Sequence, residues 1–292
     1  MASTVAAAFD QFNDRITPNA DNWKRVSERT DAVVAVLKSA FPATSSIRYN
    51  SHKIIGSLGR NTASKPISDI DLMVHLCVEP ELWRTKYQRD SSEFLYKVRR
   101  GLNSESTVRK IGARGQAVRL FYADGLAVDV AAVIKYQGGS FAIPDGAGDW
   151  LTTDPARHEA YLNEQNSALV GDLKKIIRFV KQWNKAHSSH LSSFHLEMMV
   201  ARTFASLTNN SRDGLRTFFD YNKKRLSVKD PAGFSGDLSD YLTPLARGSL
   251  FSALEAAHSR AVAANQAEVD GNHKEAIRLW RIILGDQFPQ YG

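Results

Sequence analysis

The sequence predicts an α+β fold: helices first, then a lobe built on a mixed β-sheet, then a helical lobe. Three observations support this order. Apolar residues recur at helical spacing over residues 3–16 and 21–41, two later segments have the patterns of strands, and almost everything after Pro155 has helical periodicity. Helices that are segregated from a sheet along the chain are typical of α+β architecture.

Composition and charge restrict the function further. The 292-residue chain is 43% hydrophobic and 24% charged, as globular proteins are, and it has no run of about 18 apolar residues that would predict a membrane helix. The N-terminus lacks the basic start of a secretory signal, and Cys77 is the only cysteine. We therefore expect a cytoplasmic protein without membrane attachment. The net charge of +7 favours polyanionic ligands such as nucleotides.

Local patterns predict the elements of the first lobe in order. The helix over residues 21–41 has a candidate N-cap at Asp21 and Pro42 directly after its end. In the next strand, one face is apolar (Ile70, Leu72, Val74 and Leu76) and the other begins with Asp69 and Asp71.

Residues 82–101 are expected to form one helix. Segment 116–134 predicts a β-hairpin, because Asp124 and Gly125 supply a tight turn. Residues 137–156 are rich in Gly, Pro and Asp and are expected to be a loop that crosses between the lobes.

The second lobe is expected to be helical throughout. Its predicted helices are residues 156–171, 172–186, 192–208, 211–220, 248–269 and 272–284, with Gly285 as the last C-cap. This places a sheet lobe with the N-terminal helices at residues 1–158, and a helical lobe at residues 159–292.

Three acids are candidates for one metal site. Asp69 and Asp71 are two residues apart on a strand, so both carboxylates project from the same face. Asp129 lies in an otherwise apolar strand, where a carboxylate is costly unless a cation meets it. Phosphoryl transfer needs charge neutralised and oxygens held in line, which two divalent cations about 4 Å apart can do. We therefore predict that these acids hold two divalent cations.

A polar loop precedes the first of these acids. Gly56 and Ser57 lie in a stretch rich in Gly, Ser and Thr, where backbone N–H groups can approach phosphate closely and a serine hydroxyl can bond a phosphate oxygen. A lone Asp-x-Asp or Gly-Ser pair is common. The conjunction of both with a later Val-Asp-Val strand indicates a nucleotidyltransferase.

The run from Gly56-Ser57 through Asp69-Ile70-Asp71-Leu72 to Asp129 resembles the signature of the DNA polymerase beta-like nucleotidyltransferase superfamily. The resemblance implies a two-lobed fold with a small mixed sheet, three catalytic carboxylates, two magnesium ions and a nucleoside triphosphate donor. It also implies that Asp69 and Asp71 ligate both metals and that Asp129 holds the metal at the attacking hydroxyl.

Residues 173–185 predict an amphipathic helix with a narrow basic stripe that has no acid four residues away: Lys174, Arg178, Lys181 and Lys185. A solvated face is the common interpretation, but a triphosphate is a fitting counter-charge. With Ser192-Ser193-Phe194, this helix resembles the cyclic GMP-AMP synthase and oligoadenylate synthetase branch. That resemblance implies that Lys181 and Ser193 contact the donor triphosphate and that Phe194 stacks on its base.

The end of the chain, residues 280–289, and the segments 229–231 and 236–238 resemble the bacterial CD-NTases of anti-phage signalling, the SMODS family, although an Asn-Asn pair usual in their acceptor loop is absent. The resemblance implies synthesis of a cyclic di- or oligonucleotide second messenger from ATP or other nucleoside triphosphates in CBASS defence. Further expected partners are an effector protein that binds the product and an RNA or protein activator.

Two alternatives remain open. An oligoadenylate-type or RNA-terminal nucleotidyltransferase would make linear products, and the basic residues between Arg84 and Arg119 suit RNA. A catalytically inactive nucleic-acid-binding module is the alternative of another class. The presence of all three carboxylates argues against it.

Overall fold

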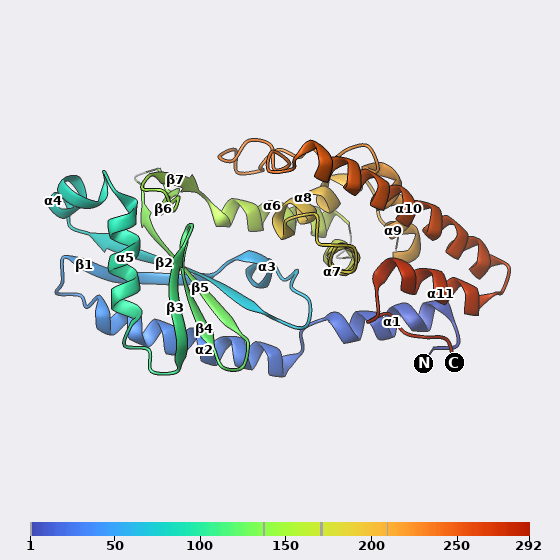
Figure 1. Cartoon of the computed structure of the whole chain (residues 1–292), viewed down its shortest axis with the longest axis horizontal. Coiled ribbons are helices and arrows are strands. Elements are labelled where there is room, and N and C mark those ends of the chain that lie inside the picture. The colour runs from blue at the N-terminus through green and yellow to red at the C-terminus, as the bar shows by residue number, and fades with distance from the viewer. Residues whose placement is uncertain (1, 137, 170–171, 209) are drawn as a thin grey trace. The chain divides into compact units, whose positions relative to one another are not determined.

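The computed structural model describes residues 2–136, 138–169, 172–208 and 210–292. The chain divides into two compact units (Figure 1), which we call the sheet unit and the helical unit. The sheet unit comprises Pro18–Arg60 and Ile67–Arg157, and the helical unit comprises Met1–Thr17, Asn61–Pro66 and His158–Gly292. Within the described residues, no helix is long and apolar enough to cross a membrane.

The sheet unit is built on a mixed sheet, as predicted. Its seven described strands are β1 (Ile47–Ile54), β2 (Asp69–Val78), β3 (Val108–Arg114), β4 (Ala117–Tyr122), β5 (Ala127–Lys135), β6 (Phe141–Pro144) and β7 (Trp150–Thr153). The main path runs β1-β2-β5-β4-β3, and β6 pairs with β5 and with β7. Strands β2 and β5 are parallel, whereas the other pairings are antiparallel.

The predicted alternation along β2 is confirmed. Ile70, Leu72, Val74 and Leu76 have no exposed surface and form part of the core of the sheet unit. The opposite face therefore presents Asp69 and Asp71, because side chains of a strand alternate between the two faces of the sheet. The predicted hairpin is also confirmed, since β4 pairs antiparallel with β5 around the turn at Asp124 and Gly125.

Two expectations for helices of the sheet unit are wrong. Helix α2 (Ala20–Ala40) is capped by Asn19, not Asp21, through a reciprocal capping box with Asn22. The helix expected over residues 82–101 is split into α4 (Pro80–Leu82), a π-helical turn (Trp83–Tyr87) and α5 (Ser91–Leu102). Asp90 causes the split, because its side chain caps α5 by accepting from the backbone N–H groups of Ser92 and Glu93.

The loop expected at residues 137–156 contains the hairpin β6–β7; residue 137 lies outside the described residues. Its turn is held by Asp145, whose Oδ1 atom accepts from the backbone N–H groups of Ala147, Gly148 and Asp149. A Gly- and Asp-rich composition marks such a turn, but pairing with β5 is a tertiary contact that composition does not reveal.

The helical unit contains α1 (Val5–Ile16), most of α6 (Pro155–Ala168), α7 (Leu173–Ala186), α8 (Ser193–Thr203), α9 (Ser211–Asn222), α10 (Pro244–Val269) and α11 (His273–Leu284). The predicted helical character is confirmed, as is the C-cap at Gly285. Residues 170 and 171, the expected end of the first of these predicted helices, lie outside the described residues. The helix expected over residues 192–208 ends at Thr203.

Helix α1 belongs to the helical unit, which corrects its expected place in the sheet lobe. The reason is aromatic packing: Phe9 contacts Phe179, Trp280 and Phe288, with ring centroids 5.0–5.7 Å apart. Phe12 stacks on Phe179 at 5.3 Å. Burying such rings is among the larger contributions to a core, and no local pattern in residues 3–16 indicates which lobe supplies their partners.

Candidate active site

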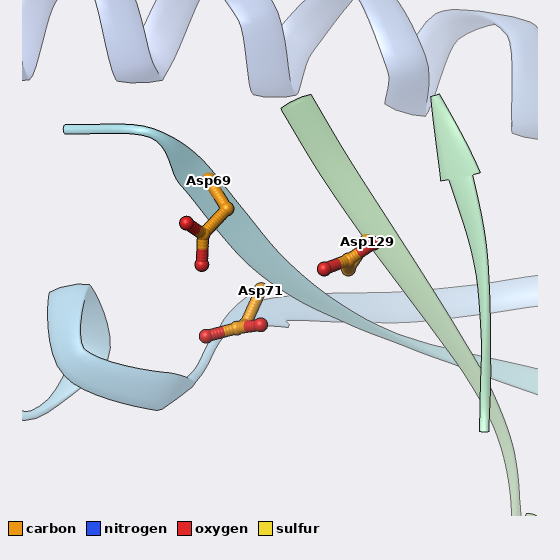
Figure 2. Close-up of side chains that lie close together, drawn as sticks. All are labelled: Asp69, Asp71 and Asp129. Atoms are coloured by element: carbon orange, nitrogen blue, oxygen red, sulfur yellow. The ribbon is translucent and has the colours of Figure 1, made fainter. Parts of the chain in front are cut away.

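Three carboxylates converge on the open face of the sheet. Asp69 and Asp71 lie on β2, and Asp129 lies on the neighbouring strand β5, directly opposite Asp71 in the parallel register. One ligand oxygen from each lies within 4.8 Å of the others, and Figure 2 shows the three side chains pointing toward one another. The predicted convergence is confirmed. It follows from alternation on β2 together with the register between β2 and β5.

The convergence is electrostatically unfavourable for the protein alone. Burial, together with the charges of Asp69 and Asp129, raises the pKa of Asp71 to about 6 against the opposing effect of Arg60 and Arg119. Burial also raises the pKa of Asp129, while the Arg119 guanidinium opposes the shift. A divalent cation would relieve this repulsion, and a site with only oxygen ligands fits Mg²⁺. The residues present therefore fit the predicted metal site.

Gly56 lies directly against this cluster. It begins the one-turn helix α3 (Gly56–Gly59) with φ +64°, and a Cβ atom added there would lie 1.8 Å from Oδ2 of Asp71. Only glycine satisfies both conditions without displacement of the acid. The backbone N–H of Ile55 donates to the carbonyl oxygen of Asp71 at 2.8 Å, so the chain that carries Ser57 is tied to β2 beside the acids.

A cavity of about 270 Å³ opens next to the acids within the sheet unit. Asp71, Gln116, Arg119 and Asp129 contribute polar groups to its lining. Nη1 of Arg119 donates to Oδ2 of Asp129 at 3.0 Å, whereas its buried Nε–H has no partner among the described residues. In the sequence, Arg119 is one of the basic residues that suit RNA, and no local pattern relates it to the acids. The cross-strand register, in which Arg119 faces Asp129 around the predicted turn, could have identified it.

In the helical unit, two of the predicted nucleotide contacts share a partner. Lys181 on α7 donates from Nζ to Oε1 of Glu197 at 2.6 Å, and Oγ of Ser193 lies 3.4 Å from the same oxygen. Glu197 therefore supplies from another helix the acid that the basic stripe lacks along its own sequence. Two neighbours in the stripe also have partners: Lys174 donates to Asn163, and Arg178 donates to the backbone oxygen of Asn61.

Phe194 packs beside the ring of His158, which no sequence motif indicates. The ring of His158 lies 4.6 Å from that of Phe194, with a 52° tilt, and Nε2 of His158 lies 2.8 Å from Oδ1 of Asp230. Although burial alone would raise it, the pKa of Asp230 is lowered by hydrogen bonds from the backbone N–H groups of Ala232 and Ser235 and from His158. Asp230 thus closes its own loop and orients His158.

Asp237, in the other segment that resembles an acceptor loop, is also turned inward. It accepts hydrogen bonds from the backbone N–H groups of Val228 and Ser239 and from the Ser227 hydroxyl. Burial alone would raise the pKa of Asp237, but these hydrogen bonds lower it to about 2. The geometry of Asp230 and Asp237 indicates that both carboxylates stabilise loops.

Comparison with known proteins gives concordant results. Residues 3–166 match the Second Messenger Oligonucleotide or Dinucleotide Synthetase domain, SMODS. A probable cyclic nucleotide synthase of Bacillus cereus is 28% identical over 83% of this chain and 84% of its own length.

Solved structures show the same fold. Vibrio cholerae DncV cyclic AMP-GMP synthase, in complex with the linear intermediate 5′ pppA(3′,5′)pG, has a TM-score of 0.77 at 14% identity and covers 97% of this chain and 96% of its own. The CdnC:HORMA-deltaN complex of Escherichia coli MS115-1 has a TM-score of 0.76 at 17% identity, and each chain is covered to 97%.

Proposed function

Because the chain belongs to the Second Messenger Oligonucleotide or Dinucleotide Synthetase family, we propose that it is a nucleotidyltransferase that joins nucleoside triphosphates into a cyclic di- or oligonucleotide second messenger. The observation that carries the proposal is the cluster of Asp69, Asp71 and Asp129, with ligand oxygens within 4.8 Å of one another. Divalent cations held by such a cluster would allow an anionic polyphosphate to bind beside the three carboxylates.

We assign metal binding to these three acids. Bound Mg²⁺ would neutralise charge on the phosphates and on the attacking oxygen. Asp69 and Asp71 project from one strand face, and Gly56 holds the backbone of α3 against Asp71. Asp129 lies on β5 opposite Asp71, and we assign to it the metal at the attacking hydroxyl, whose proton it would accept.

We assign nucleotide contacts to residues of each unit. In the sheet unit, Gly56 and Ser57 begin α3 beside Asp71, where the serine hydroxyl and the backbone N–H groups suit a phosphate oxygen. In the helical unit, Lys181 and Ser193 supply an ammonium and a hydroxyl for the donor triphosphate. Phe194 supplies a ring for its base, and stacking accepts any base.

The acceptor nucleotide is assigned to the cavity beside Asp129. Arg119 lies in its wall with a buried Nε–H that lacks a partner among the described residues, which suits an incoming acceptor atom. Gln116 adds an amide that can both donate and accept. The proton-accepting acid and these groups line the same cavity, so an acceptor hydroxyl held there would lie next to Asp129.

We further propose that the product acts through an effector protein in CBASS antiviral signalling and that a protein or RNA partner controls synthesis. The support for a protein partner is the E. coli CdnC:HORMA-deltaN complex, a structure of similar fold.

Product analysis tests the proposal. The protein is incubated with the four ribonucleoside triphosphates and Mg²⁺, and the products are separated before and after phosphatase treatment. A phosphatase-resistant cyclic product is expected, and the Asp69→Asn/Asp71→Asn variant should form none. Products that stay linear and grow by repeated addition would support the oligoadenylate-type alternative. Nucleic-acid binding without any product would support the inactive binding module.

A further inference from the structure

Glu197 is a buried charged group to which the proposed roles give no task. It lies on α8, four residues after Ser193, and none of its side chain is exposed. A carboxylate in such a place is strongly unfavourable unless hydrogen bonds and an opposite charge compensate it. The groups that contact the Glu197 carboxylate therefore indicate its role.

Its partners come from three separate parts of the helical unit. Oε1 of Glu197 accepts from Nζ of Lys181 at 2.6 Å, from Oγ1 of Thr62 at 2.9 Å and from Oγ of Ser193 at 3.4 Å. Lys181 also donates to the backbone oxygen of Thr62 at 3.0 Å. One carboxylate oxygen thus links the segment Asn61–Pro66, helix α7 and the first turn of α8.

The network restrains a side chain that is flexible by nature. A lysine ammonium ends a stem of four methylene groups and loses much rotational freedom when it is held in one place. Here the Lys181 side chain is 12% exposed and is held between Glu197 and Thr62. That leaves a small accessible surface at a defined position. A ligand that binds the ammonium there loses no further free energy to the ordering of the Lys181 side chain.

We propose that Glu197 is a positioning residue for nucleotide binding: it holds the Lys181 ammonium where a nucleoside triphosphate uses it. The inference deepens the proposed function and rests on it. Glu197 itself carries a negative charge and does not bind phosphate. Its effect on the nucleotide passes through Lys181, and this dependence separates a positioning role from a general contribution to the fold.

The test is a mutant cycle on full-length protein, with KM for ATP, kcat and the melting temperature measured for each variant. Glu197→Ala removes the acceptor and is expected to raise KM about ten-fold, the effect of losing one well-placed charge-assisted contact, with kcat changed less than about two-fold. Glu197→Gln keeps an oxygen acceptor of the same shape and should restore most of the affinity. In a Lys181→Ala background, Glu197→Ala should raise KM by less than about two-fold.

Thr62→Val provides a second route if Glu197→Ala does not fold. The substitution keeps the shape of the side chain and removes only the hydroxyl that lies between Lys181 and Glu197. It should raise KM about three-fold, and this effect should also vanish in the Lys181→Ala background.

The inference is overturned if either substitution raises KM by the same factor with and without Lys181, or if melting temperatures fall while KM stays constant. Failure of the proposed function looks different: the wild-type protein would then form no product from any combination of triphosphates.

Discussion

Gly56→Ala gives a quantitative test of how closely helix α3 packs against the acids. The added Cβ would lie 1.8 Å from Oδ2 of Asp71, and real Cβ atoms essentially never approach a heavy atom within 3.0 Å. Either Asp71 or the start of α3 must therefore move by about 1 Å or more. A displacement of this size in a catalytic group costs on the order of 100-fold in rate.

The same substitution also has a conformational cost, which must be separated from the steric one. Gly56 has φ +64°, a region that costs a residue with a Cβ atom roughly 1–2 kcal/mol. Gly271 has φ +76° with nothing within 4 Å of an added Cβ, so Gly271→Ala is the matched control. Both variants should lose stability in thermal or urea unfolding through the conformational cost, and Gly56→Ala should lose more because of its clash, but only Gly56→Ala should lose about 100-fold in kcat/KM. Equal activity of the two variants would refute the assignment of Gly56 and Asp71 to one active centre.

Four further predictions concern the acids, the nucleotide and the product. The double substitution Asp69→Asn/Asp71→Asn should abolish product formation without changing the melting temperature by more than a few degrees. Chelation of Mg²⁺ should also abolish product formation, and Mn²⁺ should restore part of the turnover. Full activity of the double variant would contradict the metal assignment. Ser57→Ala and Lys181→Ala should each raise KM for the triphosphate by a factor that corresponds to about 1–3 kcal/mol of binding free energy. Unchanged nucleotide affinity in thermal-shift titrations of both variants would disprove the donor assignment. The pKa of Asp71 is raised from 3.8 to about 6 in the folded protein, so between these pH values the metal-free folded protein binds more protons than the unfolded chain. Its stability should therefore fall as pH rises from about 4 to 6. Asp71→Asn should flatten this slope in melting curves recorded with a chelator. A transient linear species that retains its 5′ triphosphate should precede the cyclic product in time-resolved chromatography. The reason is that Asp69, Asp71 and Asp129 form the one three-acid cluster in the described part of the chain, so the same site must form each phosphodiester bond in turn. Release of a ring without such a species would contradict sequential synthesis.

Periodicity and motif spacing were sufficient to predict much of this protein. Alternation over residues 69–76 predicted which face of β2 is buried and that Asp69 and Asp71 share the other one. Asp124-Gly125 predicted the hairpin that carries Asp129, whereas the parallel pairing of β5 with β2, which brings Asp129 beside the other two acids, is a tertiary contact. Strand alternation and turn composition are local rules, in which the direction of a side chain follows from its position in the element, so one sequence is enough to apply them.

Tertiary packing decided the rest. Helix α1 contacts the helical unit because Phe9 and Phe12 find aromatic partners that lie more than 160 residues further along the chain. Strand β6 pairs with Ile134 and Lys135 at the end of β5, beyond the residues of β5 that pair with β4. Arg119 reaches Asp129, and Glu197 reaches Lys181, only once strands and helices pair in a particular register. Amphipathic patterns establish that an element has a buried face, but they do not name the residues that cover it, because apolar burial is non-directional and many partners satisfy it equally.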